Sequence, residues 1–144
     1  MTHMSRRTFL QSTLMPSVVV VAALGVPQTI RASITSRQRA HEHPTPRPGI
    51  TGANVLTAAQ LSASPHLVDV YDGIRAIPSI ADGIRCNCGC AELPGFYSLL
   101  SCFERDGMAR SCPICQGQGR VTVRLHRNGK TLAEIRSAID AQFG

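Results

Sequence analysis

Hydrophobic residues after Ser64 recur every three or four positions, which is the spacing of one face of an α-helix. Ser64 suits the N-cap of this helix, and Pro65 suits its first turn, where a missing N–H costs nothing. Pro78 predicts that the helix ends at Ile77 and that a second, short helix begins there. The apolar positions of these two helices are Leu67, Val70, Tyr71, Ile74, Ile80, Ala81 and Ile84.

The same periodicity returns at the C-terminal end of the chain. Thr131 and Glu134 have the spacing of a capping box, in which two side chains satisfy backbone N–H groups at the start of a helix. We therefore predict a helix that begins near residue 132. Its apolar stripe consists of Leu132, Ile135, Ala138, Ile139 and Phe143.

Residues 116–127 fit two patterns. Val121, Val123 and Leu125 alternate with polar residues, as they would in a half-buried strand. A helical face is also present, but the two glycines in this segment each weaken a helix by about 1 kcal/mol. The hydrophobic pattern alone narrowly favours a strand.

The first thirty residues differ from the rest, because a charged start is followed by an uninterrupted apolar run. The run covers residues 14–26, which is too short to cross a bilayer comfortably, and it exits through small residues near Ala32. Before it, Ser5-Arg6-Arg7-Thr8-Phe9-Leu10 resembles the twin-arginine export signal. We predict a twin-arginine signal peptide at 1–32 and export to the periplasm or another extracytoplasmic location. Contact with a membrane is expected only if this segment is retained.

Residues 33–56 are polar and rich in proline. Pro44, Pro46 and Pro48 stand at alternate positions, a pattern that favours an extended, polyproline-like tether. We predict a flexible linker at 33–56, with His43 solvated, and a cysteine-rich domain at 57–144.

Charge and composition narrow the partners of the chain. The net charge is +6, and removal of residues 1–32 lowers it to +3 because three arginines and no acids are lost. A nucleic-acid surface combines a basic stripe with stacking aromatic rings, whereas these arginines are scattered and only 4% of residues are aromatic. We therefore predict no nucleic-acid partner. No serine–histidine–acid set and no paired carboxylates indicate an enzyme, so we favour a role other than catalysis.

The cysteines carry the most specific chemistry. A C-x-C-x-C run would place three sulfurs on one side of an extended segment, and Gly89 would let the backbone approach a ligand closely. A C-x-x-C pair lets two sulfurs reach one ion. A pocket rich in thiolates suits Cu(I) or zinc, with an iron–sulfur cluster ranked below them. The predicted metal ligands are Cys86, Cys88, Cys90, Cys102, Cys112 and Cys115.

Two other interpretations of the six cysteines remain open. Three disulfides would join each cysteine of the first group to a distant partner and contribute about 2–4 kcal/mol each. A redox-active Cys112-x-x-Cys115 would have one thiol of lowered pKa, although the βαβ context of thioredoxin-like proteins is not visible. We favour metal because twin-arginine substrates usually fold before export, in the cytoplasm, where thiols are reduced.

The cysteines lie in four stretches with a recognisable order: IRCNCGC at 84–90, SLLSCF at 98–103, CPIC at 112–115, and GKT leading into residues 134–140. Together these stretches resemble the bacterial PCYCGC-motif proteins, which are exported or lipid-anchored and have no assigned function. Arg85 and Asn87 stand where that family has Pro and Tyr. The resemblance implies a mainly helical fold, and so favours a helix over 116–127 against the hydrophobic pattern. We therefore predict a mainly α, small cysteine-rich domain in which 116–127 is the one candidate strand.

Overall fold

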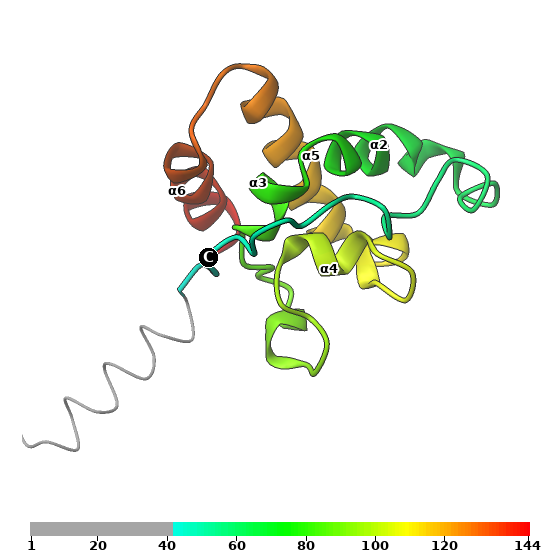
Figure 1. Ribbon diagram of the computed structural model, residues 1–144, viewed down its shortest axis with the longest axis horizontal. Coiled ribbons are helices and arrows are strands. Elements are labelled where there is room, and N and C mark those ends of the chain that lie inside the picture. Colours follow the sequence, from blue (N-terminus) through cyan, green and yellow to red (C-terminus); the bar gives the residue numbers. More distant parts are fainter. Residues whose placement is uncertain (1–41) are drawn as a thin grey trace, which may run out of the picture. The chain divides into compact units, whose positions relative to one another are not determined.

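The computed structural model describes residues 42–144 (Figure 1). The predicted signal peptide and the first part of the predicted linker, residues 33–41, lie outside the described residues. Within the described residues the fold is helical and contains no strand, which confirms the predicted fold class. No helix in this part of the chain is long and apolar enough to cross a membrane. The elements are η1 (Pro65–Leu67), α2 (Val68–Ala76), α3 (Pro78–Asp82), η2 (Cys90–Glu92), α4 (Leu99–Phe103), η3 (Met108–Arg110), α5 (Pro113–Arg127) and α6 (Leu132–Phe143), where η marks a short 3₁₀ helix.

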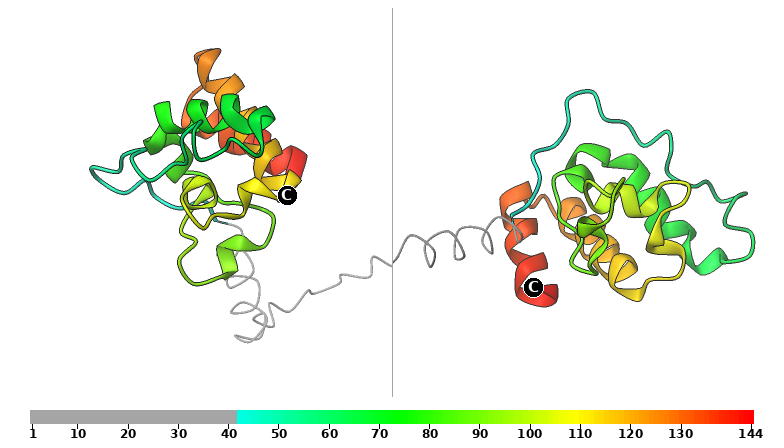
Figure 2. Two further views of the ribbon diagram at one scale, coloured as in Figure 1. Left: turned by 90° about the vertical axis from the view of Figure 1, so that its right-hand side faces the viewer. Right: turned by 90° about the horizontal axis from the view of Figure 1, so that it is seen from below.

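Helix α5 is the element that the others pack around. It contacts α2, α3, α4 and α6, as the three views together show (Figures 1 and 2). The strand favoured by the hydrophobic pattern at 116–127 is therefore wrong, and the helix implied by the family resemblance is confirmed. Val121, Thr122 and Val123 are all buried, because neighbouring elements cover α5 on more than one side. The buried face of this helix includes polar residues such as Gln118 and Thr122, so apolar residues alone do not mark it.

Two glycines explain how the helices approach α5 so closely. A Cβ atom on Gly119 of α5 would lie 2.5 Å from the ring of Phe103 in α4. A Cβ atom on Gly73 of α2 would lie 2.7 Å from the side chain of Val123. The contact that these glycines permit offsets the cost of about 1 kcal/mol that each imposes on its helix.

The helices predicted from periodicity are confirmed at both ends of the domain. The first runs from Pro65 through Ala76, ends at the predicted Ile77-Pro78 step, and is followed by α3. At α6, the Thr131 hydroxyl accepts a hydrogen bond from the Glu134 N–H, and the Glu134 carboxylate accepts one from the Thr131 N–H. This reciprocal arrangement is the predicted capping box.

Residues 42–56, hereafter the N-terminal strap, pack against the helical domain. Val55 is 2% exposed, and the Pro44 carbonyl accepts a hydrogen bond from Arg136 of α6. Arg47 forms an ion pair with the buried Asp82 at the end of α3, at 2.7 Å. The packed unit therefore begins before residue 57, where the sequence had placed the start of the domain, and this part of the predicted linker is anchored.

Asp82 is expected to be the main polar anchor of the strap. Its buried carboxylate accepts hydrogen bonds from the Arg47 N–H at 2.8 Å, from the Arg47 guanidinium at 2.7 and 3.1 Å, and from the Ser98 hydroxyl at 2.8 Å. Burial alone raises the pKa of Asp82, but these hydrogen bonds outweigh it and hold the pKa below its ordinary value. Because the pKa is depressed in the folded state, the stabilisation is present above about pH 4 and is lost as the pH falls through the folded-state pKa.

Replacing Asp82 with asparagine is expected to lower the free energy of unfolding by about 2–3 kcal/mol at pH 7. The difference in the free energy of unfolding between the variant and the wild type should narrow as the pH falls below about 4, because the wild-type carboxyl group then also becomes neutral. Urea unfolding at both pH values measures this effect. Asp106→Asn, at an exposed position, serves as the matched control and should change little. An equal loss of stability for Asp82→Asn at pH 7 and at strongly acidic pH would contradict the role of the Asp82 carboxylate as the polar anchor of the strap.

Candidate metal centre

The C-x-C-x-C segment follows α3 after a short connection. Residues 87–89 form a turn and η2 begins at Cys90, so the extended backbone expected for this segment is wrong. Gly89 has φ +90°, and a Cβ atom built on it meets nothing within 4 Å. Glycine is thus needed at this position for its backbone conformation, and not for the close approach to a ligand that the sequence suggested. The turn still directs the three sulfurs of this segment toward one another.

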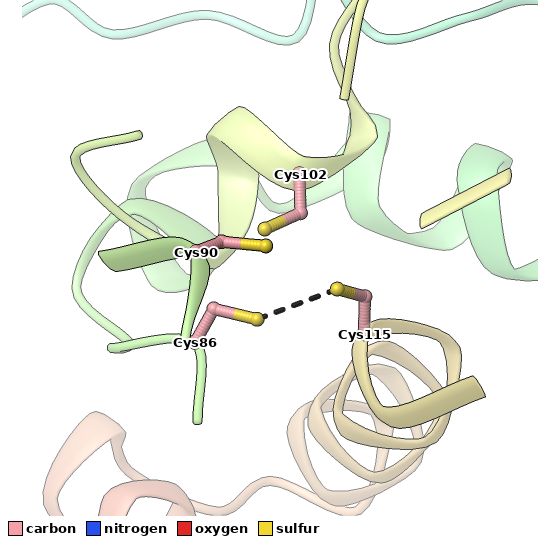
Figure 3. Close-up of side chains that lie close together, drawn as sticks. All are labelled: Cys86, Cys90, Cys102 and Cys115. Atoms are coloured by element: carbon pink, nitrogen blue, oxygen red, sulfur yellow. Dashed lines mark hydrogen bonds between the residues drawn. The ribbon is translucent and has the colours of Figure 1, made fainter. Parts of the chain in front are cut away.

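Four cysteines from three separate parts of the fold point toward one another (Figure 3). Cys86 and Cys90 come from the turn, Cys102 comes from α4, and Cys115 comes from the first turn of α5. Their sulfur atoms all lie within 4.8 Å of one another, and all four residues are buried. We call these four sulfurs the inner group.

A second group of three sulfurs adjoins the first and shares one member with it. The sulfurs of Cys88, Cys112 and Cys115 also lie within 4.8 Å of one another, and Cys88 and Cys112 are only half-buried. We call these three sulfurs the outer group. Cys88 Sγ lies 3.3 Å from Cys86 Sγ and 3.4 Å from Cys115 Sγ. All six cysteines named by the sequence therefore gather in one cluster, and all six are free thiols.

The spacing of the sulfurs suits a metal ion. A tetrahedral ion with metal–sulfur bonds of about 2.3 Å holds its sulfurs about 3.8 Å apart. The closest inner-group pair with a defined contact, Cys86 and Cys115, is 3.5 Å apart, and no pair within a group exceeds 4.8 Å. The sulfurs of each group therefore already lie close to the spacing that a bound ion requires. The cysteine cluster can therefore hold a metal.

The electrostatics of the cluster move the pKa values of its thiols in opposite directions. Hydrogen bonds from Cys102 and Cys115 lower the pKa of Cys86 to about 3. The same hydrogen bonding raises the pKa of Cys115, and burial raises the pKa of Cys88 to about 12. Partial burial would raise the pKa of Cys112, but hydrogen bonds from Cys115 and from backbone groups outweigh it and lower that pKa. Cys88 and Cys115, whose pKa values are raised, are the protonated neighbours of these thiols. A bound cation would displace protons from those neighbours, since metals bind the thiolate form.

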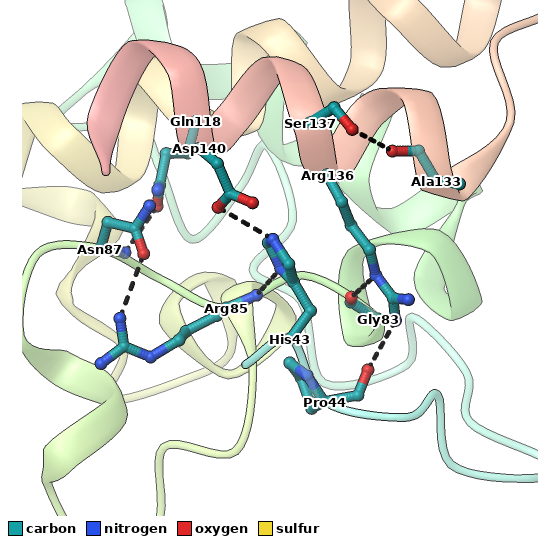
Figure 4. A network of polar contacts seen from close by, with 10 residues as sticks. All are labelled: His43, Pro44, Gly83, Arg85, Asn87, Gln118, Ala133, Arg136, Ser137 and Asp140. Carbon is teal, nitrogen blue, oxygen red and sulfur yellow. Dashed lines mark hydrogen bonds and ion pairs between the residues drawn. The ribbon is translucent and has the colours of Figure 1, made fainter. Parts of the chain in front are cut away.

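A polar network holds the cysteine turn in place (Figure 4). His43 Nδ1 accepts a hydrogen bond from the Arg85 N–H at 3.0 Å, and His43 Nε2 lies 3.0 Å from an Asp140 carboxylate oxygen in α6. The Asn87 N–H donates to the Gln118 side-chain oxygen at 3.2 Å. The turn is therefore tied to the strap, to α5 and, through His43, to α6.

Sequence reasoning missed two members of this network. His43 was interpreted as a solvated linker residue, whereas its ring is half-buried and bonded on both nitrogens. Gln118 is fully buried one helical turn after Cys115, a place where a polar residue gives no hydrophobic signal. The one available hint was its position, three residues from a cysteine within a helix, which places both side chains on one face.

Replacing Gly89 with alanine is expected to lower the free energy of unfolding by about 1–2 kcal/mol, because alanine is strained at positive φ. The turn also sets the positions of Cys88 and Cys90. With Cd²⁺ as a probe ion, the affinity of the cysteine cluster should therefore fall as well. Gly49→Ala is the matched control, because Gly49 has φ +69° and a Cβ there also meets nothing within 4 Å, but it lies in the strap. The control should lose stability and keep its Cd²⁺ affinity. Equal Cd²⁺ affinities for both variants, measured by thiolate absorbance, would contradict the role assigned to this turn.

Comparison with known proteins identifies the family. Residues 36–144 match the family described as "Protein of unknown function with PCYCGC motif". No curated protein and no solved structure matches the chain. The matched region spans the strap from residue 42, every described helix and all six cysteines. The chain therefore belongs to the PCYCGC-motif family, as its cysteine pattern predicted.

Proposed function

We propose that this protein is an exported metal-binding protein whose six cysteines store, transfer or detoxify Cu(I) or zinc. The observation that carries the proposal is the convergence of the two sulfur groups. Their cysteines come from the turn, from α4, from the connection between η3 and α5, and from the first turn of α5. Six thiols from three separate stretches of the sequence meet at distances suited to metal–thiolate bonds.

The choice of metal follows from the donor atoms. Both groups consist of cysteine sulfur alone, and soft thiolates select Cu(I) and zinc over magnesium or calcium, which prefer oxygen. An iron–sulfur cluster ranks lower. Such a cluster inserts iron and inorganic sulfide between its cysteine ligands, so it needs wider spacing than contacts of 3.3–3.5 Å provide.

A role other than catalysis fits the inner group. Catalytic zinc sites keep one coordination position open for water or substrate, whereas four buried sulfurs would close the coordination of a tetrahedral ion. A closed thiolate site retains its ion. Storage, transfer or resistance therefore suits the cluster better than a hydrolytic or redox reaction.

Export through the twin-arginine route forms part of the proposal, and it explains how the metal would be acquired. A chain that folds in the cytoplasm keeps its thiols reduced until an ion has bound. Replacing Arg6 and Arg7 together with lysine should leave the protein in the cytoplasm, as measured by cell fractionation. Normal export of that variant would contradict this route without affecting metal binding.

The decisive measurement is metal content combined with thiol counting on protein purified anaerobically. We expect bound zinc or copper, or uptake of either ion on titration, with all six thiols protected from alkylation. Six free thiols with no uptake of either ion would contradict the proposal.

A disulfide-stapled module without metal is the second candidate. It is favoured by the distances from Cys115 Sγ to Cys86 Sγ and Cys88 Sγ, 3.5 and 3.4 Å, because either pair needs only a short movement to reach the bond length of about 2.05 Å. A mass lower by about six hydrogens than that of the reduced chain, with no retained metal, would support this candidate over the first.

A further inference from the structure

We propose that the cluster binds two ions that share Cys115 as a bridging ligand, and that the outer ion is the one exchanged with the surroundings. This inference rests on the proposed metal-binding function and adds the number of ions, their order and the place of transfer.

The number of bound ions follows from how the sulfurs are grouped. The inner group provides four sulfurs and the outer group three, and Cys115 belongs to both. One tetrahedral ion uses at most four thiolates, so a single ion in the inner group leaves Cys88 and Cys112 without a role. A second ion, bound by these two sulfurs and by Cys115, uses all six. A thiolate has more than one lone pair and can bridge two ions.

The order in which the two sulfur groups meet an ion follows from the burial of their cysteines. Cys86 and Cys90 are 1% and 2% exposed, while Cys102 and Cys115 are fully buried. Cys88 and Cys112 are half-buried and in contact with solvent. Cys88 Sγ also lies 3.3 Å from Cys86 Sγ and 2.7 Å from Cys90 Sγ, so it adjoins the inner group directly. An ion that enters from solvent therefore meets the outer sulfurs first, and Cys88 can pass it inward.

The outer group is also chemically suited to exchange. Zinc with three thiolates lacks a fourth ligand, so its remaining position accepts a ligand from solution. An incoming thiol can bind there before any bond to Cys88 or Cys112 breaks, which lets the ion leave through a shared intermediate. The inner ion, held by four buried thiolates, offers no such position. Transfer to a partner is therefore assigned to the outer ion, and retention to the inner one.

Zinc is the probe for the test, and two variants separate the groups. Cys112→Ser removes a ligand of the outer group alone, and serine is a favoured residue at this N-cap of α5, so the fold should be kept. Cys102→Ser removes a ligand of the inner group alone. Circular dichroism checks the helix content of both variants. Native mass spectrometry counts the ions, and a chromophoric chelator in excess measures their release.

We expect the wild type to bind two zinc ions and to release them in a fast and a slow phase of equal size. Cys112→Ser should bind one ion and lose the fast phase, while Cys102→Ser should lose the slow phase. Saturation of the wild type with one ion, or two ions in Cys112→Ser with both phases unchanged, would overturn the inference and leave the proposed function standing. No uptake of zinc by any of the three proteins would overturn the inference, and no uptake of Cu(I) in addition would overturn the proposed function.

Discussion

Replacing Cys115 with serine is expected to weaken metal binding in both sulfur groups at once. Cys115 is the one cysteine that belongs to both groups. A structural zinc ion held by four ligands contributes about 10–16 kcal/mol, so one thiolate accounts for about 3 kcal/mol. The loss corresponds to about a 100-fold lower affinity at each group. Competition with a chromophoric zinc chelator measures both affinities.

Cys112→Ser is the matched control for this prediction. It removes a thiolate of the same cluster that serves the outer group alone, so only one of the two affinities should fall. Cys115→Ala repeats the test without a hydroxyl group that could still bind zinc. Cys115 is fully buried, so the helix content of each variant is compared by circular dichroism before titration. If Cys115→Ser loses no more affinity than Cys112→Ser, the shared position of Cys115 is refuted.

The helices that could be predicted from sequence are those with one exposed side. The stripe from Leu67 to Ile74 and the capping box at Thr131 depend on local spacing, and local spacing is fully visible in a sequence. Helix α5 was ambiguous for the opposite reason. Its neighbours bury the polar residues Gln118 and Thr122 as well as Val121 and Val123, so the buried face of this helix is not marked by apolar residues alone.

The candidate site could be predicted in its membership but not in its shape. Six cysteines in a short domain indicate a common site whatever the path of the backbone. Their division into four buried and two partly exposed sulfurs depends on how α4 and α5 pack, through contacts such as that of Phe103 with Gly119. The turn at 87–89 depends on the positive φ of Gly89. An alternating pattern of cysteines cannot distinguish such a turn from an extended segment.

The two departures from the family motif belong to one local network. Arg85 and Asn87 replace the Pro and Tyr of the motif, and the Arg85 guanidinium donates to the Asn87 side-chain oxygen at 3.3 Å. The Arg85 backbone N–H also donates to His43, a bond that proline cannot make because it has no N–H. The attachment of the strap to the cysteine turn through His43 is therefore a property of this sequence and would be absent from a chain with proline at this position.

Removing the metal is expected to lower the melting temperature by about 15–30 °C. An ion present at about 1,000 times its dissociation constant stabilises the folded state by about 4 kcal/mol. Each kcal/mol shifts the melting temperature of a domain of this size by about 4–8 °C. The ion has this effect because its ligands join the turn, α4 and α5. Thermal unfolding followed by circular dichroism, with zinc or with excess chelator under reducing conditions, measures the shift.

The change in melting temperature on removing the metal should also become smaller as the pH falls. The pKa of Cys88 is raised to about 12 and that of Cys115 is raised as well, so both thiols hold protons that the ion must displace, and acid favours the protonated form. Asp82→Asn is the matched control, because it lowers stability through the strap without touching a sulfur atom. The melting temperature of this variant should start lower and rise by a similar amount with zinc. A wild-type melting temperature that is equal with zinc and with chelator, or a zinc effect that persists unchanged from pH 8 to about pH 5, would show that the six sulfurs do not bind zinc.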